Sequence, residues 1–394
     1  MKVKDSLKVS TDIGGTFTDG VVISGGSIKV VKTETTPNGF EDGVINALKK
    51  IHIKCTDIDF FVHGSTIVIN ALTERKGGKT GLITTKGFRD VIEIGRGNTP
   101  DIYNVCYSKP KPFVPRYLRR EITERYNFKG ELITSLSEDE VIEILNDFER
   151  EGVESIGICF LHAYANADHE RKVLEIIERF NPKIKAIASH QVCREWREYE
   201  RTNTTAMSAY ILPSVSSYLD NLQNKLYSLG LSSEPFVMQS NGGIASLKSV
   251  RQNPITMVES GPVGGVLGAV AYGEMIGEQN LIALDIGGTT AKCSLISDGK
   301  IKISTDYYIE RGKKNAGYPI KTPVVDIVEI GNGGGSVAWI DEAGSLHVGP
   351  ESAGAIPGPV SYGRGGSQLT TTDANLYTGR INCDLFVGGE VKPD

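Results

Sequence analysis

The chain has 394 residues, a formal net charge of -5, 39% hydrophobic residues and 23% charged residues. This length accommodates two or three domains with cores of their own, and the composition is that of a soluble globular protein. The negative net charge provides no general attraction to nucleic acids or to anionic membranes, so neither is expected as a partner.

The N-terminal residues contain no apolar segment of the kind that directs secretion, and no window is apolar for long enough to span a bilayer. Six cysteines are scattered along the chain without a C-x-x-C pair. Free thiols in a reducing compartment are therefore predicted instead of a disulfide framework or a zinc site. The expected location is the cytoplasm.

The first predicted element is a three-stranded meander over residues 7–35, with the sequence TDIGGTFTDG (11–20) at its first turn. Two adjacent glycines between strand-like segments are an ordinary hairpin signal, because glycine adopts positive φ without a steric penalty. The same turn is suited to bind an anion, because successive backbone N–H groups of a glycine turn point into one concavity. The turn by itself leaves both interpretations open.

Strand and helix signals alternate after the meander, which predicts an α/β architecture with a mostly parallel sheet. Strands are predicted at 60–64, 80–85 and 155–161, and helices at 65–75, 137–152 and 167–180. Ser137 and Glu140 predict a capping box at the start of one helix, and Gly152 predicts its end. His63 is a candidate base or substrate ligand, and a structural role is equally open.

Two further helical regions follow. Residues 194–229 predict helical stretches that are interrupted by Pro213 and connect two lobes. Within them, REYERTNTT (197–205) is polar around the whole helix, which is typical of a solvated or interlobe face. The segment GGVLGAVAYGEMIG (264–277) is small and apolar and predicts a buried helix.

The turn motif occurs twice, as Asp12-Ile-Gly-Gly-Thr16 and as Asp285-Ile-Gly-Gly-Thr289, and predicted strands flank both copies. A shared chemical task explains why Asp, Gly-Gly and Thr recur in register, so phosphate binding is favoured over a plain hairpin. The aspartate of each copy can hold Mg²⁺ through water or orient an attacking water. The sequence contains no Walker A loop and no dinucleotide-binding G-x-G-x-x-G. Two domains on one plan are predicted, 1–190 and 191–394.

Paired strand–DIGGT–strand turns resemble the phosphate loops of the actin, Hsp70 and sugar-kinase superfamily, which has a two-lobed, ribonuclease H-like fold with ATP between the lobes. The resemblance implies ATP and Mg²⁺ as cofactors, with Asp12 and Asp285 as catalytic residues and metal ligands. The other nucleotide-binding positions that it implies are Gly14, Gly15, Thr16, Thr18, Gly287, Gly288, Thr289, Thr290, Gly333, Gly334 and Gly335.

Longer segments resemble the hydantoinase A / 5-oxoprolinase family, which includes N-methylhydantoinase A and the ATP-binding subunits of acetone and acetophenone carboxylases. The segments are 63–96, 197–213, 238–244, 260–265, 326–341 and 348–366. This resemblance implies an ATP-dependent hydrolase subunit that opens a cyclic amide of the hydantoin or 5-oxoproline type, together with a B-type partner subunit. Two alternatives stay open: the ATP-binding subunit of a carboxylase that acts on a ketone, and a non-catalytic nucleotide-binding interaction subunit. Members of this family are longer, so the closing part of the second lobe is expected to be missing or to lie on another chain.

Overall fold

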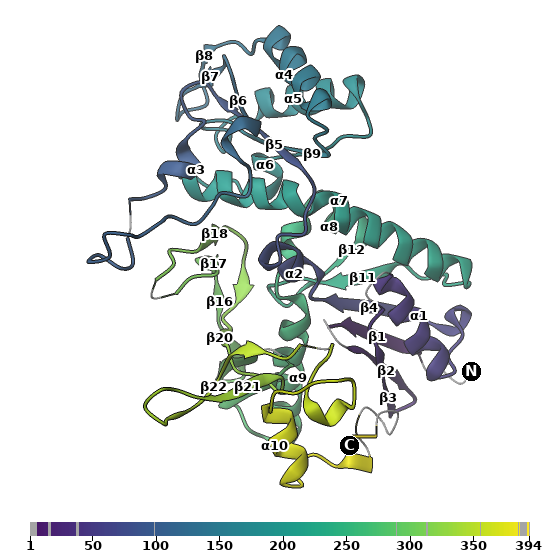
Figure 1. Ribbon diagram of the computed structural model, residues 1–394. Helices are drawn as coiled ribbons and strands as arrows, with labels where there is room; N and C mark the ends of the chain where they lie inside the picture. The colour runs from purple at the N-terminus through teal and green to yellow at the C-terminus, as the bar shows by residue number, and fades with distance from the viewer. Residues whose placement is uncertain are drawn as a thin grey trace.

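The structure, a computed structural model, describes residues 6–14, 17–36, 39–97, 99–288, 290–312, 314–354, 356–384, 386 and 392–393. In these residues the chain forms a mixed α/β fold with three larger β-sheets (Figure 1). Two helices connect the sheets, α7 (Glu198–Ser228) and α9 (Ser260–Ile276). The α/β class agrees with the prediction from the sequence.

The first sheet contains the N-terminal meander and has the strand order β12-β11-β4-β1-β2-β3. Its strands are β1 (Lys8–Ile13), β2 (Phe17–Ser24), β3 (Ser27–Glu34), β4 (Phe60–Ser65), β11 (Pro235–Met238) and β12 (Ile244–Ser246). The meander is antiparallel, whereas β4 pairs in parallel with both β1 and β11. Because β11 and β12 follow residue 190, this sheet extends across the domain boundary that the sequence predicts there.

The two faces of the first sheet have different neighbours. Val9, Thr11 and Ile13 alternate along β1 and are buried on the face that packs against α1 (Phe40–Lys50). Asp12 lies on the opposite face, because successive side chains of a strand point to opposite sides. On that side it meets Gly261 in the first turn of α9. One face of the sheet is therefore part of the hydrophobic core, and on the other face Asp12 points toward α9.

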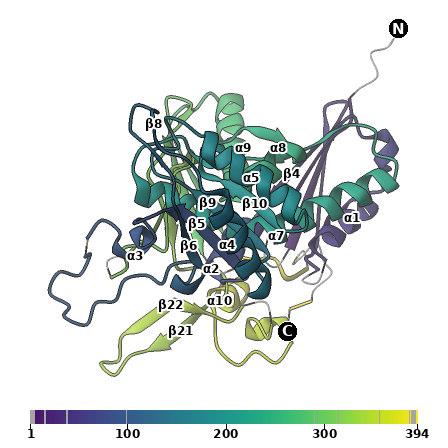
Figure 2. The same ribbon diagram turned by 90° about the horizontal axis from the view of Figure 1, so that it is seen from above.

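The second sheet is entirely parallel, with the order β10-β9-β5-β6. Its strands are β5 (Thr80–Thr85), β6 (Arg119–Ile122), β9 (Ser155–Cys159) and β10 (Lys185–Ala188). The helices α4 (Glu138–Arg150) and α5 (Asp168–Phe180) pack together beside this sheet, and α7 packs against its central strands (Figure 2). The predicted alternation of strands and helices is confirmed in this part of the chain.

The start of α4 differs in one respect from the predicted capping box. The Ser137 side chain accepts a hydrogen bond from the Glu140 N–H, as expected (3.4 Å). The Glu140 carboxylate accepts no hydrogen bond from the Ser137 N–H, which donates to the Thr123 carbonyl. It accepts hydrogen bonds instead from the backbone N–H and the hydroxyl of Thr123. Tertiary structure supplies Thr123 as a closer partner, so only half of the box forms. Gly152 ends the helix with φ = 68°, as predicted.

Helix α7 continues through Pro213, whereas the sequence predicts an interruption there. A proline inside a helix lacks an N–H donor and crowds the preceding turn. The missing N–H of Pro213 would have bonded to the carbonyl of Ala209. One residue along, the backbone N–H of Gly78 donates to the carbonyl of Tyr210 (2.9 Å). Only glycine fits this position, because a Cβ at Gly78 would lie 2.9 Å from the Pro213 ring.

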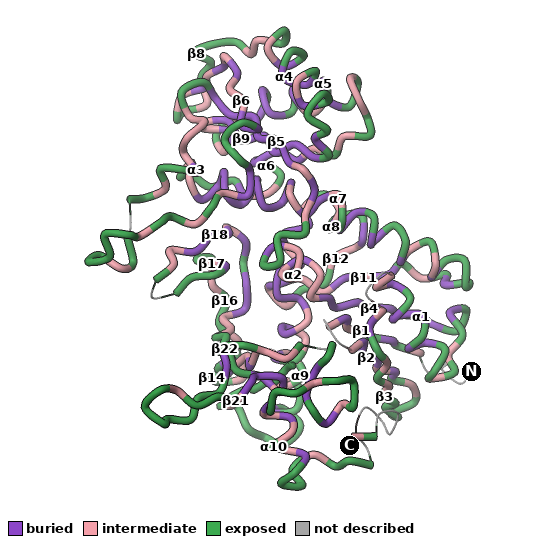
Figure 3. The backbone as a smooth tube through the Cα atoms, viewed as in Figure 1, coloured by how far each residue is buried: buried purple, intermediate pink, exposed green. Residues whose placement is uncertain are grey.

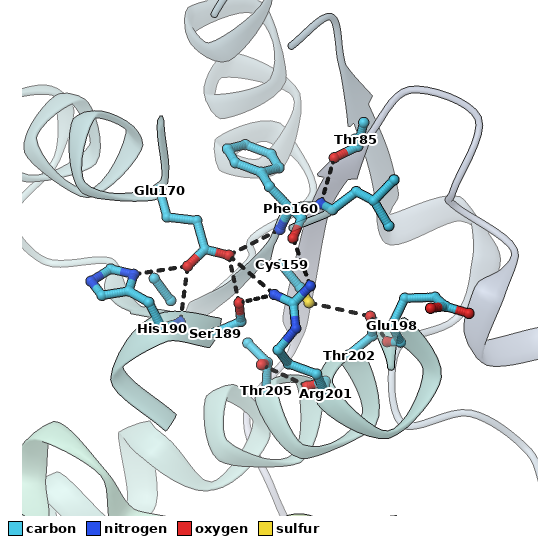
Figure 4. A network of polar contacts seen from close by, with 12 residues as sticks. Thr85, Cys159, Phe160, Glu170, Ser189, His190, Glu198, Arg201, Thr202 and Thr205 are labelled. Atoms are coloured by element: carbon cyan, nitrogen blue, oxygen red, sulfur yellow. Dashed lines mark hydrogen bonds and ion pairs between the residues drawn. The ribbon is translucent and has the colours of Figure 1, made fainter. Parts of the chain in front are cut away.

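A buried polar network fastens the start of α7 to the second sheet (Figure 4). The Glu170 carboxylate of α5 accepts four hydrogen bonds, from the backbone N–H of Phe160, the hydroxyl of Ser189, and the backbone N–H and Nδ1 of His190. Arg201 of α7 donates to the Ser189 hydroxyl and to the Phe160 carbonyl. The polar start of α7 is therefore buried against the second sheet and is not a solvated face.

The third sheet is covered on one face by α9. It contains β13 (Leu281–Ile286), β14 (Ala291–Ser297), β15 (Lys300–Ile301) and β20 (Val328–Ile330). Within α9, Val263 and Val266 are buried, but Tyr272 and Met275 are exposed. The predicted buried helix is thus buried only in part: of residues 264–277, Val266 and Gly273 are buried, because the first and third sheets pack along only part of its surface. The region around β14 includes exposed residues (Figure 3).

Shorter elements complete the described structure. The remaining helices are α2 (Ile67–Thr73), α3 (Val91–Ile94), α6 (Ser189–Val192), α8 (Leu247–Gln252) and α10 (Thr371–Tyr377). The remaining strands form the pairs β7 (Arg125–Tyr126) with β8 (Leu132–Thr134), β16 (Ile303–Ser304) with β19 (Val324–Val325), β17 (Tyr307–Ile309) with β18 (Tyr318–Ile320), and β21 (Ser336–Ile340) with β22 (Leu346–Ser352). Within the described ranges, none of the helices has both the length and the apolar character that crossing a bilayer requires. All six cysteines lie in described residues and are free thiols, as predicted.

Candidate functional site

The described residues of both DIGGT motifs border the turn of an antiparallel hairpin, which is formed by β1 and β2 in one case and by β13 and β14 in the other. Counted from the aspartate of each motif, the two hairpins have the same strand register. The first glycine closes each turn in the same way: Gly14 donates to the carbonyl of Phe17 and Gly287 to that of Thr290, both at 2.9 Å. The repeated sequence thus corresponds to a repeated local geometry.

Asp12 is enclosed by glycines from two other elements. A Cβ added at Gly64 of β4 would lie 2.8 Å from Asp12 Oδ1, and one added at Gly261 of α9 would lie 3.0 Å from it. Asp12 Oδ1 is buried and accepts no hydrogen bond within the described structure. An unpaired buried acceptor is costly to a folded protein. A cation or a hydrogen-bond donor from a ligand would therefore stabilise this carboxylate.

The surroundings of Asp12 also change its acidity. The pKa of Asp12 is raised from 3.8 to about 6; burial is the largest cause, and the negative charges of Asp19 and Asp285 contribute in the same direction, against a smaller opposing effect of Lys32. Because the charge of Asp285 raises the pKa of Asp12, the aspartates of the two motifs interact electrostatically. Carboxyl groups with a raised pKa are concentrated at functional sites.

This raised pKa predicts how stability varies with pH. Between about pH 4 and pH 6 the folded protein holds a proton on Asp12 that the unfolded chain has released, so ionisation of Asp12 on raising the pH weakens the fold. We expect the free energy of unfolding of Asp12→Asn, relative to the unmodified chain, to rise by about 1–3 kcal/mol from pH 4 to pH 7. Urea unfolding of both proteins at several pH values measures this difference. A difference independent of pH would contradict the assigned pKa.

The second aspartate borders a cavity between α9 and the third sheet. The cavity has a volume of about 290 Å³, and its lining includes Asp285, Lys292, Pro262 and Gly265. Asp285 and Lys292 are partners across the β13–β14 ladder. The aspartates of both motifs therefore face α9, Asp12 at its first turn and Asp285 along the cavity.

Lys292 is held by a buried acid at the start of α9. Its Nζ lies 2.5 Å from Glu259 Oε2, and the hydroxyl of Tyr307 donates to Glu259 Oε1 (2.9 Å). Burial is the main reason that the pKa of Tyr307 is raised, with the Glu259 charge adding to it. Glu259 has φ = 62°, a left-handed conformation that is uncommon outside glycine and occurs often at functional sites. Lys292 thus places a positive charge beside the second turn.

The glycine run near residue 333 pairs with the second DIGGT turn. The N–H of Gly334 donates to the carbonyl of Gly287 (2.9 Å), and the N–H of Gly335 donates to that of Gly288 (2.6 Å). A Cβ at Gly335 would lie 2.9 Å from the Gly288 carbonyl oxygen, so a side chain there would separate the two backbones. The run is an ordered turn between β20 and β21, as expected, and glycine is needed for this close approach. Gly333 donates to the Ser336 hydroxyl (2.8 Å).

Among the described residues, the Thr18 hydroxyl reaches the first turn through a second threonine. It is fully buried, and its hydroxyl lies 3.1 Å from that of Thr35. The Thr35 hydroxyl donates to the carbonyl of Gly14 (3.0 Å). Thr18 therefore supports the backbone of the turn in this structure, and its predicted contact with nucleotide stays a prediction.

His63 has the structural role that its sequence context left open. The ring is fully buried; Nδ1 lies 2.9 Å from the Thr11 hydroxyl, and Nε2 lies 2.6 Å from the Tyr218 hydroxyl. Burial lowers the pKa of His63 to about 3, so the ring is neutral near pH 7. With both nitrogens occupied and no exposed atoms, His63 joins β4 to β1 and α7.

Three predicted nucleotide-binding residues, Gly15, Thr16 and Thr289, lie outside the described residues. Among the described residues there is no group of three or more His, Cys, Asp or Glu side chains able to hold a metal ion. Asp12 and Asp285 nevertheless suit Mg²⁺, which usually takes one or two carboxylates and completes its shell with water and phosphate oxygens. The unpaired Oδ1 of Asp12 is the observation that supports this fit.

Four residues of the site were not singled out from the sequence. They are Gly64, Glu259, Gly261 and Lys292, and they come from β4, the start of α9 and β14. The segments HGST, ESGPVGG and DIGGTTAK contain them. No spacing rule connects these segments, because the fold alone brings β4, α9 and β14 together.

Comparison with known proteins identifies close relatives. Residues 8–180 match the family described as the hydantoinase/oxoprolinase N-terminal region, and residues 201–394 match the family described as hydantoinase/oxoprolinase. An uncharacterized protein of Methanocaldococcus jannaschii is 40% identical over 98% of this chain and 58% of its own length.

Two solved structures have the same fold. The nucleotide-free structure of an acetone carboxylase, from work on ATP-dependent acetone carboxylation, superimposes with a TM-score of 0.83 and 30% identity over 99% of this chain and 57% of its own. The ATP-dependent caprolactamase of Pseudomonas jessenii superimposes with a TM-score of 0.80 and 31% identity over 98% of this chain and 57% of its own. The chain therefore spans somewhat more than half the length of these relatives.

Proposed function

The chain belongs to the hydantoinase/oxoprolinase family, and on that premise we propose that it is the ATP-binding part of an enzyme that opens a cyclic amide. The main support is the pair of equivalent hairpins, from which Asp12 and Asp285 face α9. In addition, Asp12 Oδ1 is buried and accepts no hydrogen bond within the described structure. In this proposal the two lobes follow the plan of the actin, Hsp70 and sugar-kinase superfamily, and each DIGGT turn is a phosphate loop.

The residues around the two turns have distinct tasks in this proposal. Asp12 and Asp285 hold Mg²⁺ through water, as a carboxylate pair that also positions the nucleotide phosphates. Lys292 contributes a positive charge, which suits lysine as a phosphate ligand. The backbone at Gly288 leaves room for a phosphate, since a Cβ added there would meet no atom within 4 Å. The glycine run at 333–335 positions the second turn and borders the adenosine.

The chemistry follows from the inertness of amides. Transfer of a phosphoryl group from ATP to the amide oxygen releases ADP and makes the carbonyl carbon electrophilic. Water then adds to this carbon, and cleavage of its bond to nitrogen, which takes up a proton, opens the ring and leaves an acyl phosphate. A second water hydrolyses the acyl phosphate to the carboxylate and inorganic phosphate. The protein contributes positioning and charge stabilisation, which are the main sources of catalysis in phosphoryl transfer. A B-type subunit is the proposed partner for the hydrolytic half of the reaction.

The second candidate is the ATP-binding subunit of a carboxylase that acts on a ketone, which the likeness to acetone carboxylase supports. The same turns would serve in both enzymes. The likeness to caprolactamase favours a cyclic amide as the substrate, because a lactam is a cyclic amide. A non-catalytic nucleotide-binding subunit is the third candidate, and a neighbouring reading frame that encodes the rest of the relatives' length would argue against it.

Calorimetric titration of Mg·ATP into the purified chain tests the proposal. We expect saturable one-to-one binding that is lost when EDTA removes Mg²⁺. ATP hydrolysis, measured with the co-encoded B-type subunit present, is expected to be stimulated by hydantoin, 5-oxoproline or caprolactam and not by acetone or acetophenone with bicarbonate. Stimulation by the ketones alone would select the carboxylase, and no binding with or without the partner would refute the proposal.

A further inference from the structure

The third sheet has an apolar face that no described element covers. Its residues are every second residue of the adjacent strands β13, β14 and β20. They point to the same side of the sheet, because residues that are cross-strand partners share a face. We call them the bare face: Ile282, Leu284 and Ile286 of β13, Cys293 and Leu295 of β14, and Val328 and Ile330 of β20. None of these side chains carries a charge.

The equivalent face of the first hairpin is fully covered, so the internal repeat provides a direct comparison. Counted from the aspartate of each motif, Thr11 and Ile13 correspond to Leu284 and Ile286. Thr11 and Ile13 are each 1% exposed, whereas Leu284 and Ile286 are each 61% exposed. The difference arises because α1 packs on the first hairpin and no described helix packs at the corresponding place on the second.

We propose that the bare face is the docking surface for a polypeptide that places an amphipathic helix on it, as α1 lies on β1–β3. This polypeptide corresponds to the part of the longer relatives that the chain does not match. A sheet buries its apolar face against another layer, and isolated patches of this kind mark interaction sites. An uncharged face of Ile, Leu and Val excludes nucleic acid and favours an apolar protein surface.

The repeat also indicates what the docking helix looks like. On the first hairpin, the apolar residues Val44, Ile45, Ala47 and Leu48 of α1 are buried. Ala47 lies closest to Gly20, where an added Cβ would be 3.5 Å from the Ala47 Cβ. Cys293 is the counterpart of Gly20 in the second hairpin. The docking helix is therefore expected to carry Val, Ile, Leu or Ala at helical spacing and to cover Cys293.

Thiol footprinting tests this proposal without nucleotide. The probe is the part of the Methanocaldococcus jannaschii relative outside the matched region, produced as a separate polypeptide. N-ethylmaleimide labelling of each cysteine is followed by mass spectrometry. At saturating probe we expect labelling of the half-buried Cys293 to slow at least tenfold, while the exposed Cys106 and Cys383 keep their rates as internal controls.

Two matched variants locate the contact. Leu295→Glu places a charge on the bare face and is expected to abolish the protection of Cys293. Leu346→Glu changes an equally exposed leucine on the β21–β22 hairpin and is expected to leave the protection intact. Mg·ATP affinity, measured separately, reports on the proposed function alone, because the footprint requires no nucleotide.

Two outcomes would overturn the proposal. Unchanged labelling of Cys293 at saturating probe would mean that the relatives' additional polypeptide does not cover this face. Protection that depends only on the concentration of the chain itself, and that Leu295→Glu removes, would mean that a second copy of the chain is the occupant.

Discussion

Asp12→Asn is expected to weaken the binding of Mg·ATP by about 100-fold or more, which corresponds to the 2–5 kcal/mol that a buried charged contact commonly contributes. Asparagine keeps the shape of the side chain between Gly64 and Gly261 but removes its charge. Calorimetric titration at pH 8, where Asp12 is ionised, measures the affinity. Asp285→Asn is expected to act in the same direction, because both aspartates face α9.

The same hairpin offers a matched control. Asp19 lies opposite Asp12 in the strand register, is about half exposed and pairs with Lys32 (2.6 Å). Asp19→Asn is expected to change the affinity less than about threefold, as surface ion pairs contribute little. Because loss of the Asp12 charge is expected to stabilise the fold at neutral pH, weaker binding by Asp12→Asn could not be ascribed to unfolding. Unchanged affinity and ATP hydrolysis in both aspartate variants would remove the proposed site.

Glu170→Ala is expected to lower the free energy of unfolding by about 3–5 kcal/mol, the usual cost of removing one partner of a buried ion pair. The variant leaves Arg201 buried without its counter-charge, which lies 3.9 Å away in the native network. It also leaves the donors of Phe160, Ser189 and His190 without their acceptor (Figure 4). Urea unfolding followed by circular dichroism measures the change.

Glu175 is the control for this variant, since it lies on the same helix and is exposed. Glu175→Ala is expected to change stability by less than about 0.5 kcal/mol. The network joins α5 and β9 to the start of α7, so we expect Glu170→Ala to loosen α7 from the second sheet first. Hydrogen exchange of the amides of residues 198–205 would report this. A loss below about 1 kcal/mol in Glu170→Ala would show that the network contributes specificity of packing and little stability.

Local structure could be predicted where short-range chemistry decides it. Gly152 ends α4 because only a left-handed residue continues the chain there, and the alternation of apolar residues predicts the strands of the second sheet. Prediction was less successful where a distant residue competes with a local one. Glu140 binds Thr123 instead of completing its capping box, and Pro213 lies inside a continuous helix, at a turn against which Gly78 packs closely.

The sequence by itself determined that the chain carries two hairpins with the same turn, because the repeated Asp, Gly-Gly and Thr can be compared residue by residue. It also determined the family, since long segments carry that likeness. Only the tertiary structure decided that Gly64, Gly261 and Lys292 gather around those turns, and that His63 is locked between Thr11 and Tyr218. These residues come from strands and helices that are distant in the chain, and sequence spacing carries no information about which faces of separate elements meet.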